Sequence, residues 1–144
     1  MPIKHLLRFA LPALAIAALP LAASATTTLA GGAFIGSKTS AGVVGSAGPS
    51  LPIVPIAPQV SVAVPFNGGG RYAVTGEVRT TGSSFIGGGI GVGKLDPNGK
   101  TGTVFDGIAG GTDILPYTAL VARVYSGASR GIGTNAFVGV QIGR

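Results

Sequence analysis

Residues 84–94 read SFIGGGIGVGK, and the pattern of this stretch decides the fold class. Branched aliphatic side chains occupy one set of alternate positions, and glycines occupy the other set. The aliphatic set is Ile86, Ile90 and Val92, and the glycine set is Gly87, Gly89, Gly91 and Gly93. A period of two is the signature of a β-strand with two different faces. Residues 84–94 therefore predict a strand with apolar side chains on one face and glycines on the other.

The same alternation recurs on both sides of this stretch. Valine, isoleucine and leucine line one face, whereas glycine, threonine, glutamine and charged residues line the other. Turn-forming residues gather between the alternating segments, as at 67–70, 81–83 and 96–99. The predicted fold is an all-β, antiparallel up-and-down β-barrel of about eight strands. The strands are predicted at residues 28–36, 41–47, 59–66, 71–80, 84–94, 103–114, 117–126 and 134–143.

The start of the chain has the features of an export signal. Residues 1–8 carry basic side chains, residues 9–21 are apolar apart from two prolines, and Ala23-Ser24-Ala25 supplies small residues for a signal peptidase. The apolar run has 13 residues. A membrane-spanning helix needs about 20. We therefore expect a cleavable helical signal peptide over residues 1–25 and a single β-barrel domain over residues 26–144.

Composition excludes several classes of chemistry. The 144 residues include 26 glycines and no cysteine, and the formal net charge is +6. The one histidine, His5, lies in the predicted signal peptide. A cysteine nucleophile, a histidine-dependent triad and an ordinary zinc site are therefore excluded, and we expect no catalytic residue, no cofactor and no metal. The basic residues are scattered along the chain, which argues against a nucleic-acid interface.

Three features favour a membrane barrel. The predicted strands are about as long as a tilted strand that crosses a bilayer. One face is apolar and the other polar, as in transmembrane barrels. Eight strands enclose a space that side chains can fill. We expect a structural, non-catalytic protein of the bacterial outer membrane. The alternative is a soluble periplasmic or secreted β-sandwich or barrel that binds a ligand and buries its valines and isoleucines inside.

A family resemblance lies between Gln59 and Arg144. Its pieces are GGGIGVGKL at residues 87–95, PYTALVARVYSG at residues 116–127 and AFVGVQIGR at residues 136–144. This part of the chain resembles the small outer-membrane β-barrels of the opacity-protein type. The resemblance implies a closed eight-stranded barrel that the outer-membrane assembly machinery inserts, and it implies no catalytic residue.

Four charged residues are candidates for an interior ion pair. The acids are Glu77 and Asp106, and the bases are Arg79 and Arg123. A carboxylate removed from water needs an opposite charge beside it. We therefore expect an interior ion pair between one of these acids and one of these arginines. Arg123 shares its face with Tyr117 and Tyr125, and the alternative is that this face is outward and the two tyrosines mark interfacial girdles.

Five cations are predicted near one rim of the barrel. An even number of strands places both chain ends on one side, and if that side is the periplasm the cations lie at the outer rim. They could bind the phosphates of lipopolysaccharide, and the alternative is a rim that contacts only water. The candidates are Lys38, Arg71, Lys94, Lys100 and Arg130.

Residues 48–58 are predicted to form a proline-rich connection. Proline recurs at every third position, at residues 49, 52, 55 and 58. Polyproline II has three residues per turn, which would place these prolines on one face. The segment is expected to be a stiff linker outside the sheet, or else a ligand for an aromatic groove.

Overall fold

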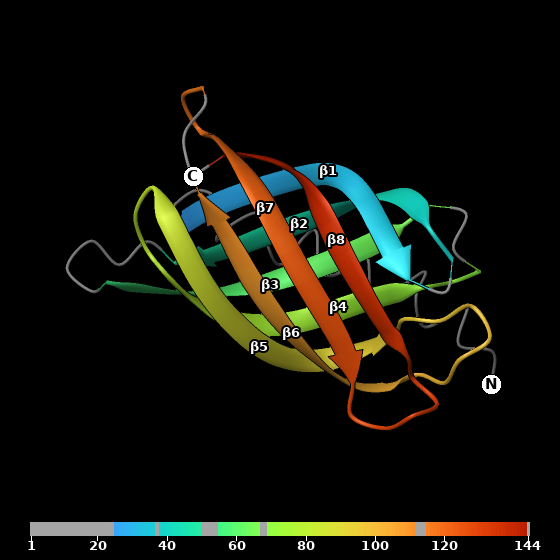
Figure 1. Ribbon diagram of the computed structural model, residues 1–144. Helices are drawn as coiled ribbons and strands as arrows, with labels where there is room; N and C mark the ends of the chain where they lie inside the picture. Colours follow the sequence, from blue (N-terminus) through green and yellow to red (C-terminus); the bar gives the residue numbers. More distant parts are fainter. Residues whose placement is uncertain (1–24, 37, 50–54, 67–68, 112–114, 144) are drawn as a thin grey trace.

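The computed structural model describes residues 25–36, 38–49, 55–66, 69–111 and 115–143 (Figure 1). Apart from Ala25, the predicted signal peptide lies outside these residues. The described residues contain no helix that is long and apolar enough to cross a membrane. They form eight strands: β1 (Ala25–Gly36), β2 (Ser40–Pro49), β3 (Ile56–Pro65), β4 (Tyr72–Thr80), β5 (Ser84–Lys94), β6 (Gly102–Gly111), β7 (Thr118–Gly127) and β8 (Thr134–Gly143).

The eight strands close into a barrel. Each strand pairs antiparallel with the next one along the chain, and β8 pairs with β1 from Thr28↔Gly143 to Gly36↔Asn135. Figure 1 shows the strands wrapped around one central space, with β7 and β8 on the near side and β3 and β4 behind them. Closure leaves no strand edge unpaired. The predicted all-β, up-and-down barrel is confirmed.

The connection between β2 and β3 is shorter than predicted. β2 continues to Pro49 and β3 begins at Ile56, so strands include both ends of the proline-rich stretch over 48–58. Residues 50–54 lie outside the described residues. Pro58 lies opposite Val78 of β4, beyond the last β2–β3 pair at Ala47↔Val60. A proline lacks an N–H donor and is tolerated where a ladder has ended.

The connection between β6 and β7 is longer than predicted. β6 ends at Gly111 and β7 begins at Thr118, so Tyr117 precedes the strand instead of opening it. The Thr118 amide donates to the Leu115 carbonyl at 3.0 Å, which closes a turn. Tyr117 takes a positive φ of 61°, a conformation outside the extended region of a strand.

The barrel has an apolar exterior. Outward positions of the strands carry no Asp, Glu or Arg, and their one lysine, Lys94, lies at the end of β5. The predicted direction holds for most of the valines and isoleucines, which are exposed on the outside, but Val44, Val104, Ile108 and Val121 face inward and are buried. The belt of exposed apolar residues comprises Leu29, Ile35, Val60, Val78, Ile86, Ile90, Val92, Phe105, Leu120, Val124, Val138, Val140 and Ile142.

The face of β5 that carries the glycines points into the barrel. A Cβ added to Gly91 would collide with the carbonyl oxygen of Val74 on β4, and one added to Gly89 would collide with that of Gly76. Glycine at these positions lets β5 lie close against its neighbour as it curves around the barrel (Figure 1). The glycine alternation in the sequence therefore has a packing cause.

Candidate functional site in the lumen and at its two ends

The up-and-down order gives the barrel two different ends. The connections β1–β2, β3–β4, β5–β6 and β7–β8 lie at one end, which we call the cationic end. The other connections lie at the opposite end together with Ala25 and Gly143, and we call it the terminal end. The lumen between the two ends has an apolar, a charged and an open section.

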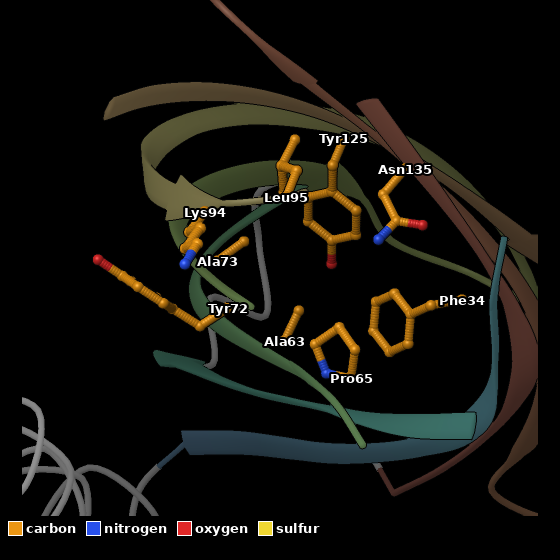
Figure 2. A pocket seen from close by; sticks show the side chains of 9 residues that line it. All are labelled: Phe34, Ala63, Pro65, Tyr72, Ala73, Lys94, Leu95, Tyr125 and Asn135. Atoms are coloured by element: carbon orange, nitrogen blue, oxygen red, sulfur yellow. The ribbon is translucent and has the colours of Figure 1, made fainter. Parts of the chain in front are cut away.

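The apolar section lies toward the cationic end. The rings of Phe34 and Phe137 lie 4.8 Å apart, and those of Phe34 and Tyr125 lie 6.4 Å apart. Leu95 and Ile132 are buried beside them from the β5–β6 and β7–β8 connections. Figure 2 shows Phe34, Leu95 and Tyr125 directed into one space. A cavity of about 10 Å³ beside Phe34, Leu95 and Tyr125 has room for about one water molecule, so these side chains fill most of the space between them.

The charged section is centred on Arg123 of β7. Its Nη1 donates to Glu77 Oε2 at 2.5 Å and to Ser61 Oγ at 3.2 Å, and it lies 3.9 Å from Asp106 Oδ2. Arg123 exposes 1% of its surface. The structure therefore brings three of the four predicted interior charges together, with Arg123 as the cation that both acids share.

Neutral polar side chains complete this cluster. Gln59 Nε2 donates to Glu77 Oε1 at 2.9 Å, and Thr75 Oγ1 donates to Asp106 Oδ2 at 2.8 Å. Gly89 pairs with Glu77 on one side and with Asp106 on the other, so no side chain separates the two acids along that row. Hydrogen bonds to a buried carboxylate offset its removal from water.

Gln59, Ser61 and Thr75 carry no sequence motif that marks them as members of this cluster. All three occupy inward positions of predicted strands, where a polar side chain is a candidate partner for an interior charge. The alternation of faces could therefore have identified them as a set. It could not have assigned each one to its acid or arginine, because that requires the register of the strand pairs. Gln59 lies opposite Glu77 on the neighbouring strand, whereas Ser61 reaches Arg123 across the barrel.

Arg79 lies apart from the cluster. Its guanidinium carbon lies 4.7 Å from the centre of the Phe85 ring, and within the described residues it has no ion pair. The Glu77 carboxylate accepts hydrogen bonds from Gln59 and Arg123. Of the two predicted arginines, Arg123 is the paired one.

Two of the predicted rim cations make structural contacts at the cationic end. Arg71 is buried and donates through Nη1 to the Lys38 carbonyl and through Nη2 to Ser40 Oγ, each at 2.8 Å. Lys94 is half-buried and donates from Nζ to the Gly69 carbonyl at 3.3 Å. Both side chains tie connections to the barrel.

The other three rim cations are exposed. Lys38 lies between β1 and β2, Lys100 between β5 and β6, and Arg130 between β7 and β8. The Lys100 amide donates to the Gly131 carbonyl at 2.7 Å, which holds the last two of these connections together. Three exposed cations therefore occupy one end of the barrel.

The side chains of the lumen and of its two ends can bind a ligand or stabilise the barrel. Within the described part of the chain, no three His, Asp or Glu side chains gather to hold a metal ion. The described charged groups include the buried cluster around Arg123, Arg79 over the Phe85 ring, and the side chains at the cationic end, where Asp96 lies among the cations. Comparison of the chain with protein-family models, curated proteins and solved structures finds no match.

Proposed function

We propose that this protein is a structural, non-catalytic β-barrel of a bacterial outer membrane, with a closed lumen. The observation that carries the proposal is the uncharged apolar exterior around a charged interior. Soluble monomers rarely expose a continuous apolar surface of more than a few hundred Å². Hydrocarbon favours such a surface, and a closed barrel satisfies its own backbone hydrogen bonds there.

The strand lengths support the same proposal. The strands have 9 to 12 residues. A strand tilted by about 45° needs about 9–11 residues to cross the hydrocarbon core. The apolar section of the lumen argues for an anchor or a recognition protein rather than an open pore. Delivery by the outer-membrane assembly machinery belongs to this proposal.

The exposed cations at the cationic end suggest what the barrel meets outside the cell. With the terminal end in the periplasm, Lys38, Lys100 and Arg130 face the lipopolysaccharide leaflet, where they contact phosphate groups. A basic side chain near an anionic membrane surface contributes about 1 kcal/mol to binding. Arg71 and Lys94 support the connections that present these three side chains.

Electrophoresis of the purified full chain tests the membrane proposal. Folded membrane barrels resist detergent and migrate differently before and after boiling, so a shift of the band on heating is expected. The protein is also expected to need detergent or lipid to stay monomeric. A chain that stays monomeric in plain buffer and shows no heat-dependent shift would be the soluble binding module instead. Fractionation of the native host locates the protein independently.

A further inference from the structure

The open section of the lumen is a pocket of about 420 Å³ at the terminal end. This volume lies in the range of small-molecule sites. The residues that line it come from β4, β5, β7 and β8 and from the connections beside them, and all of them are among the described residues. The structural role proposed above makes no use of this pocket.

Arg79 is the charged group in the pocket lining. Its guanidinium stacks on Phe85, and its Nε is buried without a hydrogen-bond partner among the described residues. Stacking engages the face of a guanidinium and leaves its in-plane N–H groups available. Those in-plane groups form the fork that binds a carboxylate through two parallel hydrogen bonds.

A second donor lies on the other side of the pocket. Gln141 of β8 is buried and lines the same pocket. In the closed barrel β4 and β8 lie four strands apart, so Arg79 and Gln141 reach the pocket from opposite sides. Pro116 and Tyr117 supply further apolar surface to the lining.

We propose that this pocket binds a small organic carboxylate, with Arg79 as the anion-binding residue and Gln141 as a second donor. One guanidinium fork and one amide match a planar monoanion. A phosphate dianion would call for more positive charge than the lining supplies, because Arg79 is the only Lys or Arg in it. This inference goes beyond the proposed membrane role and does not depend on it.

Sodium benzoate is the probe, titrated into the folded full chain in zwitterionic detergent micelles. Amide NMR shifts are followed at Ser83, Phe85, Ala119 and Gln141. Benzamide, which has the same ring without the charge, controls for partition into the micelle, and sodium chloride controls for ionic strength. Saturable shifts at the terminal end are expected with benzoate alone. Shifts that do not saturate, or that benzamide reproduces, would refute the proposal.

Variants identify the residue that binds the probe. Arg79→Gln is expected to weaken benzoate binding at least tenfold, and Arg79→Lys is expected to weaken it less, because it keeps the charge and loses the fork. Arg130→Gln at the other end is the matched control and should bind as the unaltered protein does. If Arg79→Gln does not fold, Gln141→Leu provides the second test, with severalfold weaker binding expected. Unchanged affinity in the folded variants would overturn the assignment.

Two further outcomes decide the class of ligand. If inorganic phosphate binds saturably and benzoate does not bind, the ligand of the pocket is a phosphate and the proposed carboxylate is wrong. Asp113 follows β6 in the same connection as Pro116 and Tyr117, so the chain has a carboxylate of its own nearby in the sequence. If benzoate binds only to Asp113→Asn, that side chain is the occupant, and the proposal of a separate ligand fails.

Discussion

On β7 the neighbouring residues Arg123 and Val124 meet opposite surroundings. Arg123 points into the lumen and exposes 1% of its surface, whereas Val124 points outward and exposes 59%. A water-soluble barrel would place these two kinds of side chain the other way round. The inverted order gives the barrel an apolar outer surface and an inner surface that has to neutralise its own charges.

The largest expected effect comes from Arg123→Leu on the inner surface. The substitution leaves Glu77 and Asp106 buried without their cation, and breaking a buried pair in this way costs about 3–5 kcal/mol. Urea unfolding in lipid vesicles measures the loss. The double variant Arg123→Leu with Glu77→Leu should recover part of it, because one uncompensated charge is gone. An unfolding free energy equal to that of the unaltered protein would show that the cluster is not needed.

Val124→Arg tests the outer surface one residue further along. An arginine on the lipid face costs about 2–4 kcal/mol near the middle of the bilayer and about 0–1 kcal/mol near its surface. Val124 lies near the middle of β7, so a loss of about 2 kcal/mol is expected in vesicles. Thr134→Arg at the end of β8 is the control, with a much smaller loss. Equal, negligible losses for both variants would favour the soluble alternative.

Replacing two glycines with alanine tests the packing of the barrel wall without changing any charge. Gly91→Ala places a methyl group against the Val74 carbonyl, and overpacking of this kind costs about 1–3 kcal/mol. Gly107→Ala on β6 adds the same methyl group where nothing lies within 4 Å, so little change is expected. Thermal unfolding of the two variants in the same detergent gives the difference. Similar melting temperatures would contradict the close β4–β5 packing.

The smallest effect is expected at the cationic end. Neutralising Lys38, Lys100 and Arg130 together with glutamine should weaken binding to lipopolysaccharide vesicles severalfold at low salt and leave the fold intact. Cosedimentation with these vesicles measures the change, and vesicles of neutral lipid serve as the control. Undiminished binding by the triple variant would remove the proposed phosphate contacts.

Much of the fold follows from local pattern. A strand in which Ile86, Ile90 and Val92 alternate with glycines has one apolar face, whatever its neighbours are. The 96–99 turn is equally local: the Gly99 amide donates to the Asp96 carbonyl at 2.9 Å, and the Asn98 amide donates to Asp96 Oδ1 at 3.1 Å. The β6–β7 connection was predicted less well, because no local signal places the positive φ at Tyr117.

The pairing of the interior charges was beyond sequence reasoning for a physical reason. Alternation places Glu77, Arg79, Asp106 and Arg123 on inward faces, but it does not say which of them lie at the same height in the barrel. That depends on the register of every strand pair around the circumference. Arg123 reaches Ser61 across 62 residues of chain, a contact that exists only after closure.

The sequence alone therefore determines how many strands there are, their alternating faces and most of their turns, because a period of two and turn chemistry act over a few residues. Closure decides which arginine is neutralised, which half of the lumen is filled and where the pocket opens. Side chains from strands distant in sequence become neighbours only when β8 meets β1. The charged centre and the open terminal end are accordingly properties of the closed barrel and not of any one strand.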